Sequence, residues 1–135
     1  MTNDQEKIEP DSSEFRTRLL SVLTHHIGAA NAIGMPALYQ AVFRKPWSDR
    51  INDTRRIRKL ITIMRMEGLP ICSISFAPGG YYLAAAGSEL SDYTRRYEGR
   101  ALRILQTIAR MKRVSLPYYL GQIKLDMEGG DDEAA

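Results

Sequence analysis

The sequence contains almost no cysteine and no long apolar run. Cys72 is the single cysteine in 135 residues, so no internal disulfide can form, and the chain fits a reducing compartment. No stretch of about 18 apolar residues occurs, which predicts that nothing spans a membrane. The opening segment, MTNDQEKIEPDSSE, is polar and acidic and does not resemble a signal peptide. We expect a cytoplasmic protein with one domain and no membrane partner.

The sequence also lacks the residue groupings that catalysis and cofactor binding require. His25 and His26 are adjacent in an expected helix, point roughly 100° apart and have no third ligand, so they predict no metal site. The glycine pair in APGGYY has neither the lysine nor the following helix of a phosphate-binding loop. The central carboxylates are few and scattered, and no nucleophile has a neighbouring base. The sequence therefore predicts a non-enzyme without cofactor or metal.

What the sequence has in excess is positive charge in its central part. Residues 15–125 contain 18 Lys or Arg and 6 Asp or Glu, a net charge of +12. Residues 1–14 carry −4 and residues 126–135 carry −5, so the formal net charge of the whole chain is only +3. A basic body between two acidic ends predicts a polyanionic partner. Nucleic acid is the usual one, because neutralising phosphates supplies most of the sequence-independent affinity.

Periodicity and turn residues predict a mainly helical chain with one β-hairpin. Two β-rich runs, Ile71–Phe76 and Tyr81–Ala84, flank Pro78-Gly79-Gly80, which is typical of a hairpin. The segment 29–33, AANAI, is compatible with a short extra strand. Apolar spacing and helix-ending residues predict helices over 14–28, 35–43, 53–67, 88–113 and 115–125.

The expected helix over 53–67 has an apolar side and a basic side. Asn52 or Asp53 is the expected N-terminal cap, and Gly68 ends the helix. The apolar stripe consists of Ile57, Leu60, Ile61 and Met64, which recur at the spacing of one helix face. Helices that read DNA grooves concentrate base contacts in their N-terminal half. The candidate DNA contacts on this helix are therefore Thr54, Arg55, Arg56, Lys59 and Thr62.

The hairpin needs support, because a two-stranded hairpin is barely stable alone in water. Either the face with Ile71 or the face with Cys72 and Ile74 packs on a core of three helices, while the tip projects. Tyr81 and Tyr82 alternate across the strand, so we expect one of them to be buried. The other is a candidate phosphate contact.

The order of helix, short helix, basic helix and hairpin resembles a winged helix-turn-helix DNA-binding domain of the bacterial and phage-derived kind. The run INDTRRIRKLITIMRMEGLPICS is similar to the recognition helix and first wing strand of such proteins, and GGYYLA is similar to the second wing strand. The resemblance covers roughly residues 14–86. It implies that the 53–67 helix enters a major groove and that the wing contacts DNA through Gly79 and Tyr81.

The connection before the recognition helix departs from that family. Residues 44–52 replace a tight turn and contain the only tryptophan, Trp47. We interpret Trp47 as an anchor in the loop or core rather than as a platform for base stacking. The longer connection makes Arg44, Lys45 and Arg50 candidates for contact with the DNA backbone.

The long helix over 88–113 has the spacing of a coiled-coil seam. Apolar positions alternate at four and three residues from Leu90 to Met111. Leu102, Leu105 and Ala109 form a neighbouring stripe. Either one stripe covers the winged core while the other meets a second protomer, or both pack within the monomer. We expect a homodimer, because readers of two-fold DNA sites are commonly dimeric. Its candidate seam residues are Tyr97, Ala101, Ile104, Ile108 and Met111.

The sequence thus predicts a mainly α fold with a small β-hairpin wing and a long C-terminal helix. The predicted parts are a disordered acidic N-terminus (1–13), a winged-helix domain (14–86), a helical extension (87–125) and a disordered acidic tail (126–135). The predicted function is binding of double-stranded DNA at the nucleoid. The role is transcription regulation, or replication or accessory work for a phage-type mobile element. The alternative is a protein-interaction module whose basic face receives an acidic protein partner or the chain's own tail.

Overall fold

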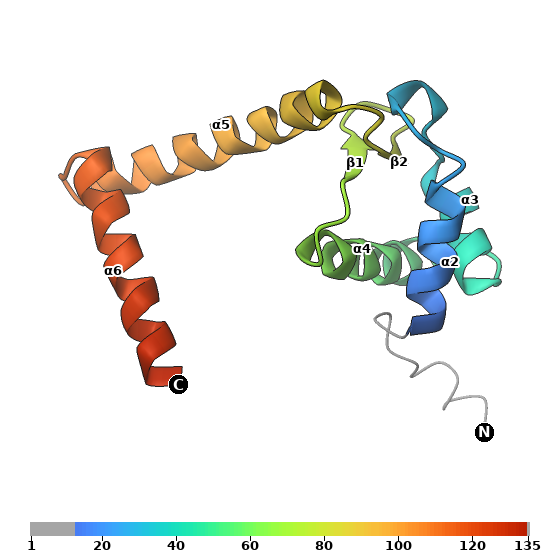
Figure 1. Ribbon diagram of the computed structural model, residues 1–135, viewed down its shortest axis with the longest axis horizontal. Coiled ribbons are helices and arrows are strands. Elements are labelled where there is room, and N and C mark those ends of the chain that lie inside the picture. The colour runs from blue at the N-terminus through green and yellow to red at the C-terminus, as the bar shows by residue number, and fades with distance from the viewer. Residues whose placement is uncertain (1–12, 135) are drawn as a thin grey trace. The chain divides into compact units, whose positions relative to one another are not determined.

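The computed structural model describes residues 13–134 of the chain, and their side chains as far as residue 129 (Figure 1). This part of the chain is mainly helical with one two-stranded antiparallel hairpin, which confirms the expected fold class. The predicted disordered segment 1–13 lies outside it except for Ser13. The elements are α2 (Ser13–Leu23), the 3-10 turn η1 (Ala29–Asn31), α3 (Met35–Phe43), α4 (Arg50–Met66), β1 (Ile71–Ile74), β2 (Gly80–Leu83), α5 (Gly87–Met111) and α6 (Leu116–Ala134).

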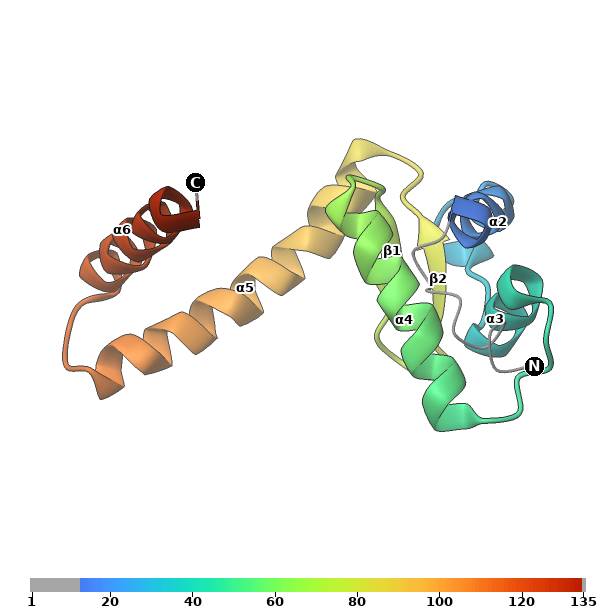
Figure 2. The ribbon, with the colours of Figure 1, turned by 90° about the horizontal axis from the view of Figure 1, so that it is seen from below.

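The chain forms two compact units, the first ending at Ser91 and the second beginning at Asp92. In the first unit, α2, α3 and α4 contact one another and share one apolar core (Figure 2). The apolar stripe predicted for α4 is confirmed, because all four of its members are at most 3% exposed. Burying one such side chain contributes roughly 1.5–3 kcal/mol. This stripe therefore fixes which side of α4 faces the core.

The start of α4 differs from the prediction, because Asp49 caps the helix instead of Asn52 or Asp53. The Asp49 carboxylate accepts the backbone N–H of Asn52 at 3.2 Å. The Asp53 carboxylate reaches back and accepts the N–H groups of Ser48 and Asp49, both at 3.0 Å. Reciprocal bonds of this kind satisfy amides that the first helical turn leaves open. Hydrogen bonds from the backbone and side chain of Asn52 lower the pKa of the Asp49 carboxyl.

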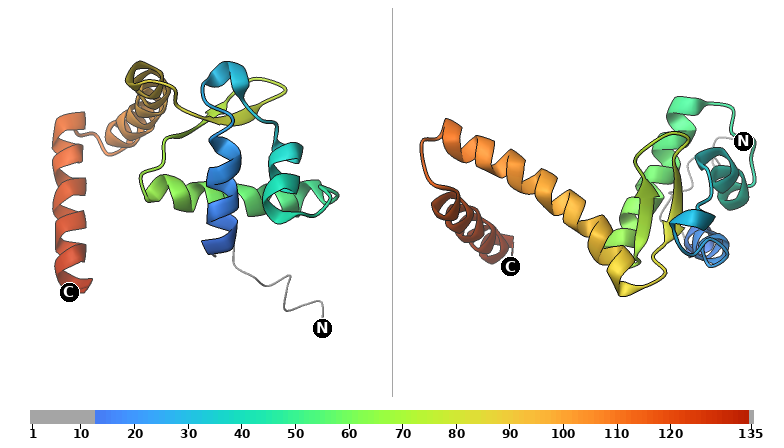
Figure 3. Two further views of the ribbon diagram at one scale, coloured as in Figure 1. Left: turned by 45° about the vertical axis from the view of Figure 1, so that its right-hand side comes forward. Right: turned by 90° about the horizontal axis from the view of Figure 1, so that it is seen from above.

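The hairpin packs on the core through its Ile71 face. Figure 3 shows the hairpin and the three helices of this unit from two sides. β1 pairs with β2 so that Ile71 lies opposite Leu83 and Ser73 lies opposite Tyr81. Ile33 adds one antiparallel bridge to the far side of β2. Its N–H donates to the Tyr81 carbonyl and its carbonyl accepts the Tyr81 N–H, both at 2.9 Å. The short strand expected within 29–33 is reduced to this bridge, because residues 29–31 form a 3-10 turn.

The second unit buries little apolar surface. Tyr93 and Ala109 are the only buried side chains among residues 92–129. A short turn joins α5 to α6, with the Val114 N–H donating to the Ala109 carbonyl at 3.0 Å. Beyond this turn the two helices share no extended contact. Neither helix therefore covers the apolar side of the other.

The acidic tail is helical where it was predicted to be disordered. α6 runs to Ala134 instead of ending at residue 125. Its Asp, Glu, Met and Ala residues are compatible with a helix, and Gly129 does not adopt the left-handed φ that commonly ends one. Acidic composition alone was therefore insufficient to predict disorder in this segment.

Candidate nucleic-acid interface

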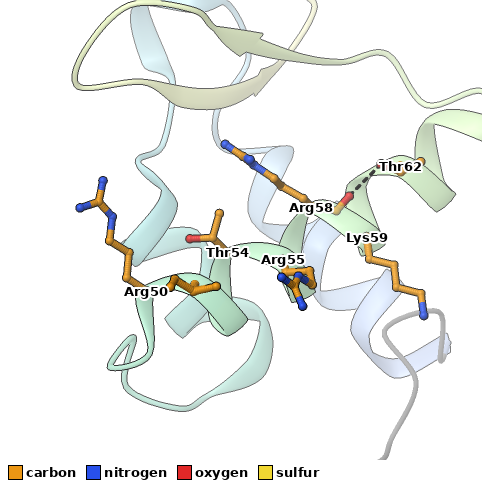
Figure 4. Close-up of a pocket in the computed structure, with 7 residues that line it drawn as sticks. Arg50, Thr54, Arg55, Arg58, Lys59 and Thr62 are labelled. Atoms are coloured by element: carbon orange, nitrogen blue, oxygen red, sulfur yellow. Dashed lines mark hydrogen bonds between the residues drawn. The ribbon is translucent and has the colours of Figure 1, made fainter.

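The solvent-exposed side of α4 is the clearest candidate site, and we call it the basic face. It lies opposite the buried stripe, because its members recur three and four positions apart on one helix. Figure 4 shows its side chains extending from α4 into solvent. They line a hollow of about 850 Å³. The members of the basic face are Arg50, Ile51, Thr54, Arg55, Arg58, Lys59 and Thr62.

Several predicted DNA contacts come together on the basic face. Thr54, Arg55, Lys59 and Thr62 line it from the helix, and Arg50 from the connection proves to be the first residue of α4. The Thr62 hydroxyl donates to the Arg58 carbonyl at 2.9 Å within the helix. Thr62 therefore offers its methyl group and an acceptor oxygen to a ligand, while its proton is engaged.

The basic face also contains Arg58 and Ile51, which are not among the predicted DNA contacts. Arg58 follows Thr54 by four positions, so helical spacing was the available signal. Figure 4 shows Arg58 pointing from α4 toward the hairpin. Ile51 is 70% exposed in the first turn of the helix. It was missed because the helix was expected to begin after it, at residue 53.

Arg56 lies on a different side of α4 from the basic face. Its guanidinium carbon is 4.1 Å from the ring centroid of Phe43 and 5.3 Å from that of Phe15. Cations over aromatic rings are attracted by the ring quadrupole. Arg56 also lines a separate hollow with Tyr39 and Asp53. Burial and the neighbouring Asp53 carboxylate raise the pKa of the Tyr39 hydroxyl. The structure thus gives Arg56 a packing role at the aromatic end of the core.

The connection between α3 and α4 places Arg44 and Lys45 apart from the basic face. Arg44 ends α3 in the left-handed conformation, with φ of 55°. Lys45 lines the same hollow as the carboxylates of Asp49 and Asp53. These carboxylates offset the positive charge there, so this hollow suits phosphate less well than the basic face does. Among the predicted contacts from the connection, Arg50 is the one that reaches the basic face.

A second hollow, of about 550 Å³, joins the basic face to the hairpin. Arg50, Thr54 and Arg58 line it from α4, while Gly79 lines it from the hairpin, as does part of Tyr81. Trp47 also borders this hollow and packs against the core, which agrees with its predicted role as an anchor. The hairpin and the basic face therefore present a continuous surface.

Both hairpin tyrosines are buried, so the expectation that one of them faces solvent is wrong. Tyr81 is 9% exposed and Tyr82 is 4% exposed. Tyr81 packs in the helical core, and Tyr82 lies opposite Cys72, which is also buried. The strand is covered on both sides, and alternation of residues cannot reveal cover on the second side. The large side chain that the hairpin exposes is Phe76, at 70%.

The predicted seam residues of α5 are exposed or half-buried within the second unit. Tyr97, Ile104 and Met111 are 45%, 56% and 79% exposed. The hydroxyl groups of Tyr93 and Tyr97 form a hydrogen bond of 2.9 Å along the helix. α6 exposes further apolar side chains, among them Tyr118, Leu125 and Met127.

Comparison with protein-family models, with curated proteins and with solved structures finds no match for this chain. Within residues 13–134, no helix combines the length and the apolar character that a membrane crossing requires. The same part of the chain contains no group of three His, Cys, Asp or Glu residues placed to hold a metal ion. The site itself therefore carries the functional argument.

Proposed function

We propose that this chain is a winged-helix protein that binds double-stranded DNA through the basic face, with the hairpin as its wing. The observation that carries the proposal is the charge of that face. It contains no acidic side chain and four cationic ones, namely Arg50, Arg55, Arg58 and Lys59. Asp53, the one acid of α4, is turned toward the helix cap. Such a surface attracts phosphate, and an exposed helix fits a major groove about 12 Å wide.

The chemistry of the basic face also suits base recognition. Arginine binds guanine through two hydrogen bonds, and apolar groups contact the thymine methyl. Arg55 and Arg58 supply the first kind of group, while Ile51 and Thr54 supply the second. Phosphate contacts position a protein on DNA, and base contacts give sequence preference. This mixture favours a transcription regulator, or a replication or accessory factor of a phage-type element, acting on DNA in the cytoplasm.

A second copy of the chain is the proposed partner of α5. The seam residues repeat at four and three positions, a spacing that pairs two identical helices. α6 does not cover them, and several remain about half exposed or more. Soluble monomers rarely expose large contiguous apolar patches. A homodimer would present two basic faces to two half-sites of one duplex.

The binding proposal is tested by titrating a labelled duplex with the full-length protein at several salt concentrations, read by fluorescence anisotropy. Arg55→Gln combined with Arg58→Gln should weaken binding by about 2–4 kcal/mol. It should also reduce the slope of log affinity against log salt, because a face with two fewer cations releases fewer counterions from the duplex. The control is Arg95→Gln with Arg96→Gln, which removes the same charge from exposed positions of α5.

The two pairs of variants separate the proposal from general electrostatic attraction. Equal losses in both pairs would show that DNA responds to net charge alone, and the basic face would lose its assignment. Salt-insensitive capture of a protein without binding to duplex DNA would instead support an interaction module that receives an acidic partner.

A further inference from the structure

The hairpin is free of charge although it adjoins a strongly cationic helix. No Asp, Glu, Lys, Arg or His occurs between Glu67 and Glu89, whereas α4 contains six Lys or Arg residues. The hairpin therefore cannot hold phosphate by charge. The hydroxyl groups of Tyr81 and Tyr82 belong to buried side chains. What the hairpin presents is the ring of Phe76, followed by Ala77 and Pro78 at the tip.

The tip is held by a well-anchored base. The Gly79 N–H donates to the Phe76 carbonyl at 2.8 Å and closes the turn. Gly80 approaches Ile33 so closely that a Cβ at position 80 would lie 3.0 Å from the Ile33 carbonyl oxygen. The next residue in the chain, Tyr81, forms the two hydrogen bonds with Ile33. The backbone of the tip is therefore held in place before a ligand arrives, which lowers the entropic cost of binding.

The tip also lies on the side of the unit that carries the basic face. Pro78 and Gly79 line the 550 Å³ hollow together with Arg58 and Thr54. A duplex whose major groove receives α4 would therefore also lie close to the hairpin. Apolar side chains of proteins that bind the minor groove frequently act as wedges, because they can replace base stacking on one side of a step.

We propose that Phe76 is such a wedge, inserting between two base pairs from the minor groove and bending the duplex. This inference rests on the proposed DNA binding and names how the hairpin takes part in it. A neutral wedge adds affinity without releasing counterions, so its contribution should not depend on salt. The bend should favour pyrimidine–purine steps, which unstack most easily.

The test uses the full-length protein and a duplex recovered by selection from a random pool, with a donor and an acceptor dye at its two ends. Energy transfer reports the bend, and anisotropy over a salt series reports affinity. Phe76→Ala should weaken binding about tenfold, leave the salt slope unchanged and straighten the duplex. Phe76→Trp should keep the bend. Arg55→Gln with Arg58→Gln should lower the salt slope and leave the bend of the saturated complex in place.

Three results would overturn the wedge. They are a straight duplex in the wild-type complex, a duplex bent by Phe76→Ala as strongly as by the wild type, and a change of the salt slope in Phe76→Ala. If the arginine variants lower the slope while Phe76→Ala has no effect, the wedge fails and the DNA-binding proposal stands. If Phe76→Ala spares DNA binding and abolishes capture of a protein, the tip belongs to a protein interface. Phe76 is exposed, so unchanged thermal unfolding of the Ala variant is the expected folding control.

Discussion

α4 and α5 carry comparable apolar stripes, but the stripe of α4 is buried and that of α5 is largely exposed. Ile57, Leu60 and Ile61 of α4 are at most 1% exposed, because α2 and α3 cover them. Ile104 and Met111 of α5 are 56% and 79% exposed in a unit that offers no cover. Periodicity therefore shows that a helix face requires a partner, while the rest of the chain decides whether that partner is internal. This difference separates a self-contained core from a surface suited to association.

The largest predicted effect is the difference in stability between two Leu→Ala variants, one in α4 and one in α5. Leu60→Ala should lower the free energy of unfolding by about 3 kcal/mol, because Leu60 is fully buried and leaves a cavity. Leu102→Ala should change it by less than about 0.5 kcal/mol in dilute solution, because Leu102 is 48% exposed. Denaturant titration measures both. A loss at Leu102 equal to that at Leu60 would show that the folded chain buries α5 after all.

Adding charge to the α5 seam should break the proposed dimer. Ile104→Glu with Ile108→Glu places unpaired charges in an apolar contact. The dissociation constant of the dimer should therefore rise at least about 100-fold. The helical signal of the first unit should persist. Light scattering with circular dichroism measures both properties.

The matched control changes the opposite side of the same helix. Gln106→Glu with Arg103→Gln alters the net charge by the same amount and should leave the dimer intact. A wild type that scatters as a 15.3 kDa monomer at high micromolar concentration would end the dimer proposal before any variant is made.

The smallest predicted effect concerns how the free energy of unfolding depends on pH, and it compares the N-terminal caps of α4 and α6. The lowered pKa of Asp49 means that its capping contribution is fully present above pH 3.8, the ordinary value, and is lost as the pH falls through the native pKa. Ser115, whose hydroxyl accepts the Tyr118 N–H at 3.2 Å at the start of α6, does not titrate there.

Replacing Asp49 by serine tests this difference. Asp49→Ser should keep a cap and remove its share of the stability that is lost as the pH falls below 3.8 toward the lower native pKa. Denaturant titrations of both proteins across that range give the comparison. If the free energy of unfolding falls equally in the wild type and in Asp49→Ser, the Asp49 carboxylate has no role in the pH dependence of stability.

The sequence predicted the features that depend on one helix or one turn. The stripe of α4 and its end at Gly68 follow from local spacing and glycine chemistry, and both are confirmed. The helix start was less predictable, because DRINDT offers four residues that can cap a helix, and the reciprocal bonds of Asp49 and Asp53 select one of them. Caps of equal chemistry are distinguished by geometry, which the sequence does not display.

Features that depend on distant residues were predicted less well. Arg56 belongs by spacing to a polar helix side, but two aromatic rings from α2 and α3 draw its guanidinium away from the basic face. Tyr82 is buried because the hairpin is covered on its second side as well. Such surroundings involve residues far apart in the chain, so neither periodicity nor turn chemistry predicts them.

The most direct test of the proposed function is an amide NMR titration of the full-length protein with duplex DNA. The account predicts that the largest shift changes fall on Arg50–Thr62 of α4 and on Phe76–Gly79 of the hairpin. The basic residues of α5, from Arg95 to Arg110, should change little, although they offer a similar number of cations. Shift changes confined to α5 and α6, with α4 unaffected at saturating DNA, would contradict the assignment of the basic face.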